Sequence, residues 1–295
     1  MTTTSTGPEA ETRTAFAQAT AGTDAQRRLA AQIAACGVER NVAELELYGY
    51  TVVPDAAPLE LFDRIRDAIV RITQETRDRG VKPFDFGPNT SMMYRLLAHD
   101  DVFAEAVLTP KLTALMTYLL GEGYALNVAT GSILSQGANA GPLHCDNQFF
   151  PEPFPAQYHV AVGIWCCDDF SGELGSTLVV PGSHRRHRHP RAGEGINEAI
   201  AVEAPRGSIV IWTGHTWHAS GGRTAPGDRI ALHTGFSRPH IQPFEGYAPE
   251  DVDRLTKLDA RLARLLGADL PYSFKGDSPD LDKLLSLAAT TQAQA

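Results

Sequence analysis

The sequence predicts a mainly β domain, a sandwich or barrel of short strands, with helices packed outside it. Two observations lead to this fold class. Residues 124–236 contain a series of short β-rich runs separated by clusters of Gly, Pro, Asn and Ser, which is typical of all-β sandwiches and barrels. The first half instead carries apolar residues three and four positions apart, a spacing that predicts amphipathic helices.

Helices and one strand are expected before the β-rich half. Residues 24–36 are helix formers, and residues 41–47 follow a helical pattern that stops before Gly49. Residues 50–54 are β-rich and end at a proline, which predicts a short strand. A long amphipathic helix then ends at Gly80, and a further helical block runs over 102–120. The apolar stripe of the long helix is formed by Phe62, Ile65, Ile69 and Ile72.

The expected strands follow, and a last amphipathic helix ends before Gly267. The β-rich runs cover residues 125–135, 160–167, 177–180, 208–212 and 230–236. Residues 1–23 are rich in Thr and Ala without an apolar core, so we expect a disordered tail. Residues 24–295 are predicted to form a single catalytic domain.

Composition excludes several classes of partner. A net charge of −9 argues against nucleic acid, and no apolar run reaches the length of about 18 residues that a membrane span needs. One basic run, residues 184–191, is either a solvated loop or a contact to an anionic substrate. The spacing of the four cysteines fits neither a disulfide framework nor a Cys-based zinc site, which favours the cytoplasm.

A pair of polar residues carries the first chemical signal. His144 and Asp146 are two positions apart, so in an extended segment both side chains point to one face while Cys145 points away. Imidazole plus carboxylate suits iron(II), and two histidines with one carboxylate leave positions open for oxygen. The third ligand must come from a distant strand, and spacing alone allows either His215 or His218.

Arg229 opens a β-rich run eleven residues after His218. An arginine inside a barrel needs an anionic partner because burying an unpaired charge is costly. Its planar fork fits a carboxylate, such as the distal carboxylate of a dicarboxylic cosubstrate. The alternatives are a structural salt bridge to a nearby acid or a solvent-facing strand end.

These residues together resemble the phytanoyl-CoA dioxygenase (PhyH-like) family. The resemblance covers roughly residues 45–267 and rests on His144-Cys145-Asp146, the Gly175-to-His184 segment with its Pro-Gly-Ser-His loop, Gly207-Ser208, His218 and Arg229. It implies a double-stranded β-helix (jelly-roll, cupin-like) core and a dioxygenase that uses iron(II), 2-oxoglutarate and molecular oxygen. It further implies His144, Asp146 and His218 as metal ligands and Arg229 as the partner of the 2-oxoglutarate C5 carboxylate.

The resemblance extends to the cosubstrate contacts, with one departure. Thr177 matches a position that hydrogen-bonds 2-oxoglutarate in some relatives. Many relatives carry a Gln three residues before the first iron histidine, where this chain has Gly141. The contact passes to Asn127, Ser135 or Gln136, or to none of them.

The expected reaction is oxidation of a small, hydrophobic, natural-product-like molecule of secondary metabolism, with hydroxylation favoured over desaturation or ring rearrangement. Because Asp146 keeps the carboxylate that halogenating relatives lack, oxygenation is expected over halogenation. The residues expected to line the substrate pocket are Met93, Tyr94, Phe149, Phe150, Trp165 and Trp217, with plain core packing as the alternative for each. Alternative functions are hydroxylation of an acyl-CoA or amino-acid substrate, or non-oxidative cupin-type metal chemistry. A homodimer is one option for the assembly.

Overall fold

The computed structural model describes residues 24–83, 87–148, 150–268, 274–275 and 278–279. The chain divides into a unit of residues 36–270 and a second unit formed by its two ends. The second unit contains helix α2 (Asp24–Cys36) up to Ala35, and the antiparallel pair β10 (Phe274–Lys275) and β11 (Ser278–Pro279). The predicted tail, residues 1–23, lies outside the described residues. All candidate site residues belong to the 36–270 unit, which is described from here on.

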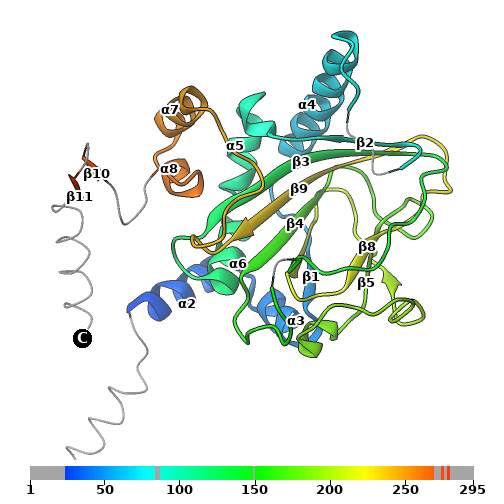
Figure 1. Cartoon of the computed structure of the whole chain (residues 1–295), viewed down its shortest axis with the longest axis horizontal. Coiled ribbons are helices and arrows are strands. Elements are labelled where there is room, and N and C mark those ends of the chain that lie inside the picture. The colour runs from blue at the N-terminus through cyan, green and yellow to red at the C-terminus, as the bar shows by residue number, and fades with distance from the viewer. Residues whose placement is uncertain (1–23, 84–86, 149, 269–273, 276–277, 280–295) are drawn as a thin grey trace, which may run out of the picture. The chain divides into compact units, whose positions relative to one another are not determined.

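Two antiparallel sheets form the centre of this unit (Figure 1). The larger sheet has the order β1-β7-β4-β9-β3-β2, and the smaller has the order β6-β5-β8. The strands of the larger sheet are β1 (Tyr50–Val53), β2 (Thr90–Met93), β3 (Ala125–Ser135), β4 (Val160–Cys166), β7 (Ile209–Thr213) and β9 (Asp228–Ser237). Those of the smaller are β5 (Thr177–Val179), β6 (Ile200–Ala201) and β8 (His218–Ser220).

Helices pack on the outer face of the larger sheet. α4 (Leu59–Asp78) contacts β3 and β9, and α6 (Pro110–Leu120) contacts β4. The ring of Phe62 on α4 lies 5.1 Å from that of Trp165 on β4. The remaining helical elements are α3 (Glu39–Tyr48), η1 (Leu96–Ala98), α5 (Val102–Val107), η2 (Ser183–Arg186), α7 (Pro249–Leu258) and α8 (Arg261–Leu265). No described helix has the length and apolar character that crossing a bilayer requires.

Two predicted helices are each divided. The block over 102–120 breaks into α5 and α6 because Pro110 has no N–H and disfavours helical backbone at the residue before it. Thr109 accordingly has φ −58° and ψ 131°, and Pro110 begins α6. The last helix breaks at Asp259, which is extended between α7 and α8. The short strands β2, β6 and β8 were not predicted.

A hydrophobic core fills the space between the two sheets. It joins the inner face of the larger sheet to β5 and to the segment after β6, and its fully buried members are Ile164, Cys166, Phe170, Val179, Val202, Ala204, Val210, Trp212 and Ala231. Because side chains alternate along a strand, the opposite face of the same strands meets the helices. Both faces of β4, β7 and β9 are therefore buried, and the candidate site lies on the inner one.

Candidate metal centre

Three side chains from distant parts of the chain converge between the sheets. His144 and His218 form an antiparallel bridge in which each backbone N–H donates to the other's carbonyl, at 2.9 and 2.8 Å. Asp146 is held beside them because its N–H donates to Gly214 O at 3.0 Å. One ligand atom from each side chain can be chosen so that all lie within 4.8 Å of one another, and the described residues contain no other such group.

Hydrogen bonds behind this group set its donor atoms. Nδ1 of His144 lies 3.0 Å from Pro142 O, and Nδ1 of His218 lies 3.0 Å from Thr216 O. A carbonyl can only accept, so each Nδ1 carries the proton and each Nε2 keeps its lone pair for a metal. Those Nε2 atoms lie 4.0 and 3.6 Å from oxygens of Asp146. Two neutral imidazoles and one carboxylate are a donor set that fits iron(II).

Trp212 holds the carboxylate from the other side. Its indole Nε1 donates to Asp146 Oδ2 at 2.9 Å, and its ring lies 4.6 Å from the ring of His218. Trp212 is itself 2% exposed, within the core between the sheets. The contact has no signal in the sequence, because it depends on β7 lying beside a segment 66 residues earlier in the chain.

His215 lies outside the group. Its ring is 1% exposed and is surrounded by the rings of Phe154, Tyr158 and His187, at 5.3, 5.0 and 5.5 Å. Burial lowers the pKa of His215 to about 4, so the imidazole is neutral at ordinary pH. Of the two histidines that spacing allowed, the structure brings only His218 to His144 and Asp146.

Arg229 is a buried cation on the same inner face. It is 3% exposed, its Nη2 donates to Gly175 O at 3.0 Å, and its guanidinium lies 4.6 Å from the Phe170 ring centre. Its Nε and Nη1 have no hydrogen-bond partner among the described residues. Burial lowers the pKa of the guanidinium to about 10, a sign of how much desolvation costs this charge. No carboxylate of the described residues forms a salt bridge with this guanidinium, and burial keeps solvent away from it. An anionic ligand could therefore bind it.

The predicted cosubstrate contacts differ in position. Thr177 is 5% exposed and two residues before Val179, so it shares the inner face of β5. Asn127 lies seven residues before Leu134, the register partner of Arg229, which is roughly 20 Å along the strand. Gln136 is exposed and donates to Thr224 O at 3.3 Å. Ser135 donates to Asp228 at 2.7 Å.

Several predicted pocket residues lie elsewhere. Trp165 packs against Phe62 under the helices, and Met93 pairs with Gly131, whose own outer side meets Ile69 of α4. These two side chains therefore face away from the metal group, because strand alternation places them on the outer face. Tyr94 follows β2 and is 37% exposed. Phe149 lies outside the described residues.

Trp217 and Phe150 are directed behind the metal group. Trp217 belongs to a buried cluster that includes Cys145 and Phe154, and Phe150 packs against it. Alternation along the chain explains the direction of Trp217 and Cys145, because side chains next to His218 and His144 point the opposite way from the histidines themselves. The predicted outward direction of Cys145 agrees with this position.

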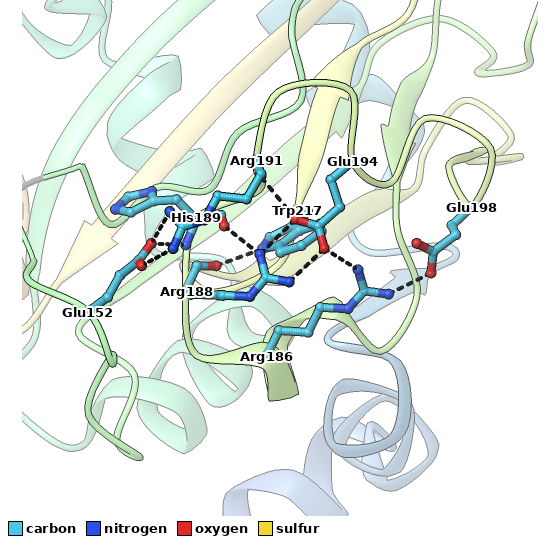
Figure 2. A network of polar contacts seen from close by, with 8 residues as sticks. All are labelled: Glu152, Arg186, Arg188, His189, Arg191, Glu194, Glu198 and Trp217. Atoms are coloured by element: carbon cyan, nitrogen blue, oxygen red, sulfur yellow. Dashed lines mark hydrogen bonds and ion pairs between the residues drawn. The ribbon is translucent and has the colours of Figure 1, made fainter.

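The basic run forms an ion-pair network over Trp217 (Figure 2). Its members are Arg186, Arg188, His189, Arg191, Glu152, Glu194, Glu198 and Trp217. Arg188 makes a bidentate pair with Glu194 at 2.6 and 2.7 Å, and Arg191 pairs with Glu152 at 2.6 Å. The guanidinium groups of Arg186 and Arg188 lie 4.5 and 5.1 Å from the Trp217 ring centre. Carboxylates of the chain thus pair with three of the four arginines of this run, while Arg185 donates to Glu46 O. This argues against an anionic substrate there.

Comparison with known proteins gives one family and a set of similar folds. The family described as "Phytanoyl-CoA dioxygenase (PhyH)" matches residues 45–231. An uncharacterized protein of Mycobacterium tuberculosis is 26% identical over 233 residues, covering 76% of this chain and 84% of that protein. A dioxygenase of Aspergillus fumigatus, af480, is 28% identical over 198 residues, covering 65% of this chain and 64% of that protein.

Two solved structures illustrate the shared fold. HygX from Streptomyces hygroscopicus, with nickel and 2-oxoglutarate bound, has a TM-score of 0.57 at 17% identity, covering 71% of this chain and 90% of that one. SnoK, a carbocyclase dependent on α-ketoglutarate from nogalamycin biosynthesis, has a TM-score of 0.57 at 15% identity, covering 70% and 86%. The predicted double-stranded β-helix core with flanking helices is confirmed.

Proposed function

The chain belongs to the phytanoyl-CoA dioxygenase (PhyH) family of iron(II)- and 2-oxoglutarate-dependent dioxygenases, and we propose that His144, Asp146 and His218 hold its iron while Arg229 anchors its 2-oxoglutarate. Family membership confirms the predicted enzyme class and cofactors, and it argues against the alternative of non-oxidative cupin-type metal chemistry. The residue assignments are the proposal.

One observation carries the assignment of Arg229. It is a fully buried guanidinium with two nitrogens that no described residue bonds, on the inner face that also holds the metal group. A carboxylate of 2-oxoglutarate supplies the opposite charge and acceptors in the fork geometry that arginine prefers. Thr177, on the inner face of β5 near Gly175, is the second proposed contact.

Bound iron with 2-oxoglutarate supplies the activation of oxygen, and the residues of the chain position and shield the reactants. The Nδ1–H bonds to Pro142 O and Thr216 O keep both imidazoles oriented, and Trp212 keeps the carboxylate of Asp146 turned toward them. The side chain of His144 is 46% exposed and that of His218 is 7% exposed. The open side of the group is therefore at His144, and we propose that the substrate approaches from there.

The proposed substrate is a small molecule of natural-product type, and hydroxylation is the proposed reaction. HygX and SnoK support this class, since hygromycin B is bound in one HygX structure and SnoK acts in nogalamycin biosynthesis. Three of the residues predicted to form a hydrophobic pocket, Trp165, Met93 and Trp217, point away from the metal group. They therefore do not support a hydrophobic substrate. An acyl-CoA is less well supported, because the network of Figure 2 already pairs three of the four arginines that CoA phosphates would use.

Anaerobic titration tests the assignment of the cosubstrate anchor. The wild-type protein loaded with iron(II) should bind one 2-oxoglutarate, seen as a metal-to-ligand charge-transfer band in the visible. Arg229→Gln should keep iron affinity and lose 2-oxoglutarate affinity by about 100-fold, as expected for a hydrogen-bonded charge pair. Arg223→Gln is the matched control, since Arg223 is also buried but already donates to three carbonyl groups. Equal 2-oxoglutarate affinity in wild type and Arg229→Gln would refute the proposed anchor.

Asp146 makes a separate prediction about the reaction. It retains the carboxylate, so turnover in excess chloride should yield oxygenated and not chlorinated product. Mass spectrometry of the products decides, and a chlorinated product would overturn the proposed reaction type.

The four cysteines are free in the structure, which supports the reducing cytoplasm as the proposed site of action.

A further inference from the structure

His233 occupies the inner face of β9, between Arg229 and the metal group. It follows Arg229 by four residues, so both share a face with Ala231, which belongs to the core between the sheets. Across the sheet His233 is in register with Ile164 of β4 and Thr130 of β3. The next inner row along β9 contains Gly235, Val162 and Trp212, the residue that holds Asp146. A ligand that reaches from the metal group to Arg229 has to pass His233.

The ring of His233 is fixed on one side only. Its Nε2 lies 2.9 Å from Oγ of Ser132, which is 1% exposed and lies on the neighbouring strand β3. The Ser132 hydroxyl also lies 3.5 Å from Ala231 O. Nδ1, the other ring nitrogen, has no hydrogen-bond partner in the part of the chain that is described. His233 is half-buried, and this nitrogen is open to contact, so a ligand lying between the sheets can reach it.

The charge of His233 suits a place beside an anion anchor. Burial, together with the neighbouring Arg229 guanidinium and His218, lowers the pKa of His233 to about 3. The imidazole is therefore neutral, and it adds a hydrogen bond without competing with Arg229 for the anion's charge.

We infer that the Nδ1–H of His233 donates to 2-oxoglutarate between the iron and Arg229, and that Ser132 is the positioning residue whose hydroxyl donates to Nε2 and so fixes the ring and its tautomer. This inference rests on the proposed function, because it needs the cosubstrate to run from the metal group to Arg229. His233 would be a second residue of β9, after Arg229, that contacts 2-oxoglutarate. Ser132 of β3 would act through His233.

Two amide substitutions separate the nitrogens of His233. In His233→Asn the amide reaches the position of Nδ1, and in His233→Gln it reaches that of Nε2 and keeps the bond to Ser132. With iron(II) under anaerobic conditions, His233→Gln should raise the dissociation constant of 2-oxoglutarate about 10-fold or more, as for a lost hydrogen bond to a charged group. His233→Asn should stay within about threefold of wild type, because it retains the contacting atom.

Iron affinity and melting temperature are measured for both variants as controls. Both variants should bind iron(II) as tightly as the wild type and melt at a similar temperature, which a merely structural role of His233 would not predict. Unchanged 2-oxoglutarate affinity in His233→Gln, or equal losses of 2-oxoglutarate and iron in both variants, would overturn the inference. If the wild type itself bound no 2-oxoglutarate, or Arg229→Gln bound it normally, the proposed function would fail first, so the two failures are distinguishable.

Discussion

Replacing Trp212 by Phe should weaken iron binding while leaving the fold intact. The substitution removes one hydrogen bond, from Nε1 to Asp146 Oδ2 at 2.9 Å, and keeps an aromatic ring in the core. A hydrogen bond to a charged acceptor contributes about 1.5–3 kcal/mol. Since about 1.4 kcal/mol is a factor of ten, the iron dissociation constant should rise roughly 10- to 100-fold. That is also the range for losing a partner that orients a metal ligand.

The chain offers a matched control in Trp165. Its ring is 0% exposed, and its Nε1 has no hydrogen-bond partner among the described residues. Trp165→Phe therefore removes the same atoms from the opposite face of the same sheet without removing a hydrogen bond. Competition with a chromogenic chelator under anaerobic conditions measures the iron affinity of both variants, and thermal melts of the metal-free proteins measure their stability. If Trp212→Phe and Trp165→Phe bound iron equally well, the orienting role of Trp212 would be refuted.

Three further predictions concern stability. His215 has a folded pKa of about 4 against an ordinary 6.5, so its contribution is complete above 6.5 and is lost as pH falls toward 4; His215→Phe should flatten the decline in denaturation free energy over that window, and an unchanged slope would contradict this. The Glu245 carboxylate accepts from Arg95 N, Ala129 N and the Tyr247 hydroxyl at 2.9, 2.9 and 3.0 Å, and Glu245→Gln leaves only one acceptor oxygen. The free energy of unfolding in urea should therefore fall by about 1–3 kcal/mol. A fall of less than about 0.5 kcal/mol would contradict this. Arg188→Met removes a partly exposed ion pair and should lower stability only slightly, by an amount that shrinks in high salt, with unchanged 2-oxoglutarate affinity; a large loss of that affinity would show that the basic run binds an anion.

The group proposed to hold the metal could be predicted from short-range periodicity and the order of the motifs. His144 and Asp146 share a face by the two-residue repeat of an extended segment, and Cys145 packs behind them as that repeat requires. The choice of His218 over His215 needed the resemblance, since nothing in their spacing says which ring enters the group. The structure separates them by burying His215 among the rings of Phe154 and Tyr158.

The pocket residues could not be predicted from periodicity because the central strands are buried on both faces. The inner face of β4 meets the smaller sheet, and its outer face meets α4 and α6, so apolar residues occupy both. Alternation then predicts that Trp165 and Ile164 point in opposite directions. It does not predict which of the two points toward the metal group. The contacts of Trp212 and Ser132 were missed for a related reason, since each spans 66 or 101 residues of chain.

Burial on both faces also makes the register of β9 decisive for function. A slip of one residue would exchange Arg229 for Ile230 on the inner face and His233 for Thr234, which removes both proposed cosubstrate contacts at once. Hydrophobicity opposes such a slip only weakly, because both faces are apolar. Polar contacts hold the register instead: Ile230 N donates to Asp168 Oδ2 at 2.8 Å, Thr234 Oγ1 donates to Gly163 O at 2.9 Å, and Arg229 Nη2 donates to Gly175 O at 3.0 Å. The Arg229 and Thr234 side chains lie on opposite faces of the strand, and the Ile230 N–H lies in the plane of the sheet. A slipped register would therefore leave buried polar groups unpaired on both faces, and this cost fixes Arg229 and His233 toward the metal group.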